Sequence, residues 1–180
     1  MIHSRTRLSE RLRDHALDTG ADGGGERDLG DLPAWDLSDL YAAEDAPEFA
    51  RDLDWLASAC ADFATDYEGK LAGLEAAGLL DCVRRYERID IVAGRLMSFA
   101  GLRYYQNTTD PGRSKFLGDT QQRVTDDTAP LVFFSLELNR IEDDRLAALL
   151  DENADLARYK PIFDRLRTMK PYQLSDELEK

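Results

Sequence analysis

Residues 75–107 read EAAGLLDCVRRYERIDIVAGRLMSFAGLRYYQN, and this stretch decides the fold. Its apolar side chains recur at intervals of three and four residues, which is the period of an α-helix. They form two stripes: Ile89, Val92, Leu96 and Phe99, and then Ala93, Met97, Ala100 and Tyr104. Two apolar stripes predict a central helix packed between neighbours. About 30 residues at about 1.5 Å each give a rod of roughly 45 Å.

The preceding stretch predicts a helix that begins at Asp45 and ends near Gly69. Asp45 is a good N-cap residue, Pro47 suits the first turn, and Glu48 completes the pattern of a capping box. Apolar side chains then follow at helical spacing: Phe49, Leu53, Leu56, Cys60, Phe63 and Tyr67. Glycine at position 69 is a typical helix stop.

After the central stretch, Asp110 is expected to cap a third helix with Pro111 in its first position. This helix continues through Phe116, Leu117 and Val124. Pro130 is expected to kink or split it, because proline lacks the N–H group that an interior helical position donates. The apolar rhythm then resumes with Leu131, Phe134, Leu138 and Ile141.

Two shorter helices are expected near the end of the chain. One contains Leu146, Leu149 and Leu150, and the other contains Leu156, Tyr159, Phe163 and Leu166. Pro161 weakens the first turn of the second helix, so its start is expected near that residue. No stretch alternates with a period of two, so we expect an all-α fold: an antiparallel bundle of long helices with shorter C-terminal helices.

The chain is expected to have two parts, a flexible tail at residues 1–30 and a helical domain at residues 31–180. The tail is rich in glycine and poor in large apolar residues, which disfavours a packed structure. A lead-in segment with four large apolar side chains is expected to be held against the core: Trp35, Leu37, Leu40 and Tyr41.

The last residues have the pattern of a helix start. Ser175 is a typical N-cap, and Asp176, Glu177 and Glu179 are acids favoured in a first turn. A single turn is unstable by itself, so we expect the natural chain to continue beyond Lys180.

Charge and composition exclude some classes of partner. The 180 residues carry 23 basic and 36 acidic side chains, for a formal net charge of −13, which repels nucleic acid and anionic lipid. No apolar run approaches the roughly 20 residues that span a bilayer, and Met1 to Arg13 does not resemble a secretory signal. Cys60 and Cys82 are interpreted as reduced, buried thiols of a cytoplasmic protein.

No catalytic, cofactor-binding or metal-binding residue is predicted in this chain. The acid pairs Asp36 with Asp39, Asp126 with Asp127, and Asp143 with Asp144 are interpreted as caps or solvated faces. The histidines, His3 and His15, lie in the expected tail and lack the i, i+4 spacing of a helical metal pair. Tyr104 and Tyr105 are interpreted as packing residues, and Asp110 as a cap. Phosphate-loop, nucleophile-elbow and Cys-x-x-Cys motifs are absent from the sequence.

Four stretches carry a resemblance to a known family. They are Pro33–Tyr41 (PAWDLSDLY), Tyr104–Pro111 (YYQNTTDP), Ala129–Asn139 (APLVFFSLELN) and Lys170–Lys180 (KPYQLSDELEK). In order and separation they resemble the N-terminal region of oligoendopeptidase F, a thimet-oligopeptidase-like zinc metallopeptidase. The resemblance covers about Pro33 to Lys180.

The resemblance implies a fragment of a larger, cytoplasmic, all-α enzyme that hydrolyses short peptides. Its zinc and its H-E-x-x-H motif would lie in a downstream catalytic domain, since this chain lacks that motif and should be inactive alone. The N-terminal domain would form a wall of the substrate channel, pack on the catalytic domain and meet oligopeptide substrates. Without that domain, the uncovered apolar helices are expected to support self-association. The alternative is a free-standing acidic helical interaction module without enzymatic activity.

Overall fold

A computed structural model describes residues 35–172, which fall within one compact unit. Over these residues the chain is all-α, without a strand. The helices are α1 (Pro47–Tyr67), α2 (Ala76–Gln106), α3 (Pro111–Thr128), α4 (Val132–Arg140), α5 (Asp143–Glu152), α6 (Ala154–Ala157) and α7 (Lys160–Arg167). Short 3₁₀ turns lie at Leu71–Gly73, Ala129–Leu131 and Lys170–Tyr172.

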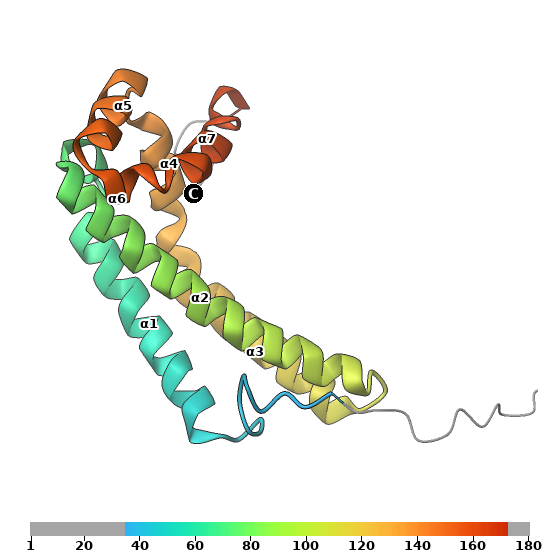
Figure 1. Cartoon of the computed structure of the whole chain (residues 1–180). Helices are drawn as coiled ribbons and strands as arrows, with labels where there is room; N and C mark the ends of the chain where they lie inside the picture. The colour runs from blue at the N-terminus through green and yellow to red at the C-terminus, as the bar shows by residue number, and fades with distance from the viewer. Residues whose placement is uncertain (1–34, 173–180) are drawn as a thin grey trace, which may run out of the picture. The chain divides into compact units, whose positions relative to one another are not determined.

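Three long helices form the predicted antiparallel bundle. Figure 1 shows α2 running the length of the bundle, in contact with both α1 and α3. The shorter helices α4 to α7 gather at the end where α2 begins (Figure 1). The expected fold class, including its shorter C-terminal helices, is therefore confirmed.

Helix α2 occupies nearly the whole of the stretch that was expected to form it, with Glu75 and Asn107 as its flanking caps. Ile89, Leu96 and Phe99 of the first stripe are buried. The second stripe is less deeply covered, because Ala93 and Met97 are only partly buried against the core. The expected central position is confirmed, but the two faces of the helix are not equally enclosed.

Helix α1 begins at Pro47, so the predicted N-cap at Asp45 is wrong. Ala46 occupies the cap position in an extended conformation, and no side chain caps this helix end. The residue before a proline is disfavoured in the helical region, which fixes the boundary between Ala46 and Pro47. Glu48 pairs with Arg51 in place of a capping box. The end of the helix agrees with the prediction, since Gly69 has a positive φ of 79°.

The predicted cap and break around the third helix are both confirmed. The side chain of Asp110 accepts hydrogen bonds from the backbone N–H groups of Gly112 and Arg113. Pro130 lies within the 3₁₀ turn that separates α3 from α4. The proline thus splits the helical path rather than bending it.

The last predicted helix is divided in two. Asn153 caps the short α6 through its side chain, and α7 begins at Lys160 with Pro161 in its first turn. The expectation of a start near Pro161 therefore holds for α7, while Leu156 belongs to a separate turn of helix.

The lead-in segment is held at the far end of the bundle, although not by Trp35. Tyr41 is buried, makes an edge contact with Phe49 at 5.0 Å between ring centroids, and donates a hydrogen bond to Asp52. The side chain of Trp35 is 66% exposed, and its segment is held instead through its backbone carbonyl, which accepts a hydrogen bond from Gln106. The expectation that Trp35 packs on the core is wrong.

An aromatic cluster around Phe63 joins the three long helices to the shorter ones. The fully buried ring of Phe63 contacts four other rings: Tyr67, Tyr86, Phe133 and Phe134. Glu137 of α4 reinforces this junction by accepting hydrogen bonds from the backbone N–H groups of Gly69 and Leu71. These contacts fix where α4 leaves the bundle and therefore position the helices that follow it, α5 to α7.

Some predictions lie outside the described residues: the tail at residues 1–30, with His3 and His15, and the helix start at Ser175. The division into a tail and a domain stays a prediction. Within residues 35–172, no helix has both the length and the apolar character needed to cross a lipid bilayer.

Candidate functional site

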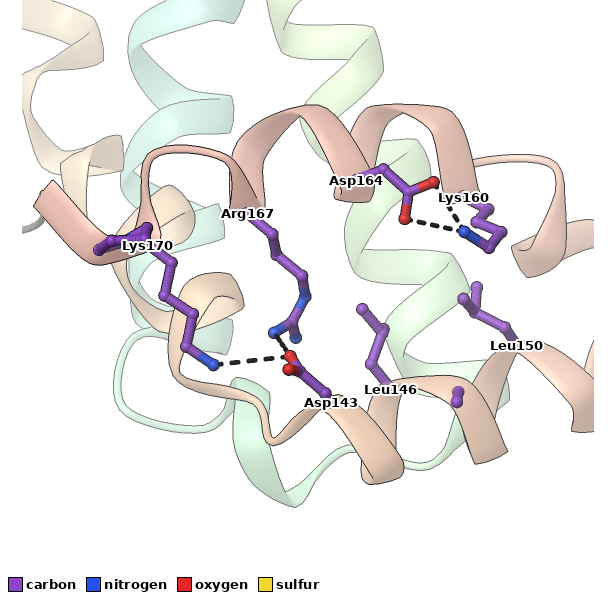
Figure 2. Close-up of a pocket in the computed structure, with 9 residues that line it drawn as sticks. Asp143, Leu146, Leu150, Lys160, Asp164, Arg167 and Lys170 are labelled. Carbon is purple, nitrogen blue, oxygen red and sulfur yellow. Dashed lines mark hydrogen bonds and ion pairs between the residues drawn. The ribbon is translucent and has the colours of Figure 1, made fainter.

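Two hollows lie on opposite sides of α7. The first, which we call the α5–α7 cleft, has a volume of about 510 Å³. Its lining residues are Asp143, Leu146, Ala147, Leu150, Lys160, Asp164, Arg167, Lys170 and Pro171. Figure 2 shows the side chains of Leu146 and Leu150 directed from α5 towards α7, with charged groups above and beside them.

Arg167 is the central charged residue of the α5–α7 cleft. Its guanidinium donates to the backbone carbonyl of Ile141 at 2.6 Å and pairs with the carboxylate of Asp143 at 2.5 Å (Figure 2). A longer bond at 3.4 Å reaches the carbonyl of Leu138. These two carbonyls lie at the C-terminal end of α4, where the helix leaves acceptors without intrahelical donors. Arg167 therefore caps α4 and ties it to α5 and α7.

The remaining charges of the cleft are also paired with one another. Lys160 contacts Asp164 at 2.7 Å, one helical turn away, and Lys170 approaches Asp143 at 3.6 Å. Both lysines and both acids are substantially exposed, so each pair contributes little to stability. Every charged group that lines this cleft thus has an internal partner, which is the arrangement of a structural junction.

The second hollow, which we call the α2–α4–α7 groove, combines two adjoining cavities. One has a volume of about 450 Å³ and lies between α2, α4 and α7. The other, of about 320 Å³, lies between α2, α3 and the start of α4. Both cavities are lined by Tyr86, Asp90 and Ser135, so they adjoin along these three residues.

The floor of the α2–α4–α7 groove belongs to the core, whereas its rim does not. Tyr86 stacks on Phe134 with ring centroids 4.0 Å apart, and Phe134 is buried. Three aliphatic side chains at the edges are exposed: Ile91 (62%), Ile162 (54%) and Val132 (45%). Aliphatic side chains gathered around an apolar floor are typical of a surface that contacts a partner.

The charges of the groove are not all paired. Glu87 accepts a hydrogen bond from the hydroxyl of Tyr159 at 2.8 Å, and this bond, followed by burial, raises the pKa of Tyr159. Asp90 makes no hydrogen bond or ion pair with any residue in 35–172. Its carboxylate acts only at longer range, where it adds to the effect of burial in raising the pKa of Tyr86. The groove therefore presents an uncompensated carboxylate beside apolar side chains.

The acid pairs singled out from the sequence do not form a site. Asp36 accepts from the backbone N–H of Ser38, and this bond lowers the pKa of its carboxyl. Asp126 accepts from Gln122 and Asp127 from Arg123, each within α3. Asp143 is part of the α5–α7 cleft, and Asp144 lies in the first turn of α5. Local turns and ion pairs account for these interactions.

The candidate tyrosines and cysteines occupy separate places. Tyr104 and Tyr105 contact each other with ring centroids at 5.4 Å, and Tyr105 is 71% exposed rather than packed. Cys60 and Cys82 are free and buried, as expected. Burial raises the pKa of the Cys60 thiol to about 11 and that of Cys82 to about 12, so both thiols are poor nucleophiles at neutral pH.

No group of three His, Cys, Asp or Glu side chains in residues 35–172 is arranged to hold a metal ion. The donor set of this part of the chain does not fit the zinc ion that the resemblance implies for the whole enzyme.

Sequence reasoning missed both hollows. Arg167 donates hydrogen bonds to carbonyls that come near it only in the folded chain, and no local sequence pattern predicts such bonds. Ile91 did leave a signal, because it is a large aliphatic residue of α2 that belongs to neither apolar stripe. An aliphatic side chain that lies off the buried faces of a helix is a candidate for an exposed contact surface.

Residues 35–172 thus form an all-α domain with one cleft whose charged groups are paired internally and one open apolar groove. The family model described as oligopeptidase F, for the N-terminal region of these peptidases, matches residues 137–180. Over these residues the match confirms the resemblance to the N-terminal region of oligoendopeptidase F. It contains the fourth stretch of that resemblance, Lys170–Lys180, and all the residues that line the α5–α7 cleft. No curated protein and no solved structure matches the chain.

Proposed function

We propose that this chain is the non-catalytic N-terminal domain of a zinc-dependent oligoendopeptidase. In this proposal the domain forms one wall of a channel for short peptides and packs on a catalytic domain of the same cytoplasmic polypeptide. The zinc ion and the H-E-x-x-H motif belong to that catalytic domain. Residues 35–172 supply shape and a docking surface rather than chemistry.

The family match over residues 137–180 is the observation that carries this proposal. Two structural features support it. The chain folds into the expected all-α architecture, and its α2–α4–α7 groove leaves aliphatic side chains uncovered. A groove with exposed aliphatic side chains at its rim is typical of a surface that contacts another protein.

The second candidate is a free-standing acidic helical module that binds another protein. The same open groove favours it, since a groove with exposed aliphatic side chains suits any protein partner. The coding sequence beyond Lys180 separates the two candidates. We expect H-E-x-x-H to follow in the same reading frame, and a natural stop directly after Lys180 would favour the interaction module.

Self-association through the uncovered helices is also a proposal. If it occurs, we expect it to reflect the absence of the catalytic domain. A mass measurement in solution at several protein concentrations tests it, and a strictly monomeric chain would contradict it.

A further inference from the structure

The α2–α4–α7 groove differs from an ordinary surface depression in three respects. Its floor is formed by the stacked rings of Tyr86 and Phe134, which are held by the core. Its rim carries the exposed aliphatic side chains of Ile91 and Ile162 on the two sides of one cavity. Asp90 lines both of its cavities and has no hydrogen-bond or ion-pair partner among the residues described.

The charged residues in the groove indicate which kind of partner segment would bind there. Asp90 is the sole charged residue that lines the smaller cavity, and Glu87 adds a second carboxylate to the larger one. Arg165 is the basic residue in that larger lining, and it lies across the groove on α7. A partner with an apolar side chain for the floor and a Lys or Arg for Asp90 would match both features, because covering an unpaired carboxylate with apolar groups alone is costly.

A second copy of this chain, which the uncovered helices could hold when the catalytic domain is absent, matches the charge of the groove less well than a basic segment does. Each copy carries a formal net charge of −13, so two copies repel each other at any distance that salt does not screen. The same argument disfavours an acidic peptide. The charge pattern therefore points to a basic and apolar segment.

We infer that the α2–α4–α7 groove is the surface on which the catalytic domain docks, through a segment that carries apolar side chains and a Lys or Arg facing Asp90. This inference rests on the proposed function and adds the place and the chemistry of the contact. Ile91 and Ile162 become covered on docking, and the basic side chain of the segment pairs with Asp90. The α5–α7 cleft, whose charges are already paired, stays open to solvent.

Cysteine labelling tests this inference in two proteins, the 180-residue chain and the longer polypeptide that includes the catalytic region. The variants Ile91→Cys and Ile162→Cys place a thiol on the rim, and Ser58→Cys places one on the exposed surface of α1, which lines neither hollow. The native Cys60 and Cys82 are buried with raised pKa values, so a neutral maleimide reacts first at the new thiol in the chain. Mass spectrometry of the peptide containing the new cysteine gives the rate in both proteins.

In the longer polypeptide we expect labelling at positions 91 and 162 to slow by at least about tenfold relative to the chain alone, as protection by a stable contact requires. Labelling at position 58 should change little. Equal rates at positions 91 and 162 in the two proteins would overturn the inference. Protection that grows with protein concentration would also overturn it, because a second copy would then cover the groove.

A charge reversal tests the basic segment. In the longer polypeptide with Ile162→Cys, we expect Asp90→Lys to restore most of the lost labelling rate. The matched variant Asp62→Lys changes the net charge equally on α1 and should restore none. If position 162 stays equally protected from labelling in the Asp90→Lys variant, no Lys or Arg of the docked segment pairs with Asp90. Peptide hydrolysis by the longer polypeptide is measured in parallel: an active enzyme with an unprotected groove refutes only this inference, whereas an inactive one refutes the proposed function.

Discussion

The two hollows beside α7 share a helix but differ in how their charged groups are satisfied. In the α5–α7 cleft, Arg167 binds two carbonyls and a carboxylate, and the lysines are paired with acids. In the α2–α4–α7 groove, Asp90 has no such partner in the described chain, and Ile91 and Ile162 are exposed. The cleft with internally paired charges therefore holds the fold together, whereas the groove with an unpaired carboxylate is available to a partner.

The largest expected effect is on the free energy of unfolding, which a substitution in the floor of the groove should lower far more than one at its rim. Phe134→Ala removes a buried ring that contacts Phe63 and Tyr86, and we expect it to lower the free energy of unfolding by about 3–5 kcal/mol. Urea unfolding followed by circular dichroism measures this change. Val132→Ala at the rim is the control and should cost less than about 1 kcal/mol. A loss below about 1 kcal/mol for Phe134→Ala would show that the floor is not part of the core.

The next effect tests the α5–α7 cleft as a structural junction. Arg167→Met keeps much of the side-chain volume but removes the donors to Ile141 and Asp143, so we expect a loss of about 2–3 kcal/mol in the free energy of unfolding. Lys160→Met breaks only an exposed ion pair and should cost less than about 0.5 kcal/mol. If the two variants unfold at the same urea concentration, Arg167 does not hold the cleft.

A smaller effect concerns the hydrogen bond at the edge of the groove. Tyr159→Phe removes the bond to Glu87, and because both groups are partly exposed we expect a loss of only about 0.5 kcal/mol at pH 7. The pKa of Tyr159 is raised above its ordinary value of 10.0, so the stability from this bond is present below pH 10.0 and is lost as the pH rises through the raised value. Urea unfolding of both proteins across this range should show their difference shrinking. A difference that grows above pH 10.0 would contradict this sign.

The smallest effect is expected at the rim. Ile91→Ser and Ile162→Ser replace exposed aliphatic side chains, so each should change the stability of the 180-residue chain by no more than about 0.5 kcal/mol. Thermal unfolding of the chain measures both. A loss approaching that of Phe134→Ala would mean that the rim packs within the chain, and the contrast between the two hollows would disappear.

Much of the fold was predictable because its signals are local. The central position of α2, the cap at Asp110 and the break at Pro130 each follow from neighbouring residues, and the structure confirms all three. Asp45 was predicted wrongly as a cap because Pro47 moves the boundary of α1 to Ala46. Trp35 was predicted wrongly to pack on the core: its side chain is exposed, and its segment is held by a backbone hydrogen bond that no side-chain pattern reveals.

The candidate site was less predictable because it depends on contacts between distant segments. Asp90 and Ile162 meet in one lining only after α7 has folded back beside α2. Nothing near Asp90 in the sequence indicates that its carboxylate lacks a partner. The absence of an H-E-x-x-H motif was readable directly, and it left the role of the chain to the family resemblance and to the structure.

Peptide hydrolysis by the proposed longer polypeptide decides whether this chain is the N-terminal domain of a zinc-dependent oligoendopeptidase. The substrates are a quenched fluorescent peptide of about ten residues and a folded protein that contains the same sequence. We predict that the polypeptide cleaves the free peptide, spares the folded protein, and loses activity on chelation until zinc is restored, while the 180-residue chain is inactive throughout. A longer polypeptide without zinc-dependent peptidase activity would refute this assignment, and so would a 180-residue chain that cleaves the peptide by itself.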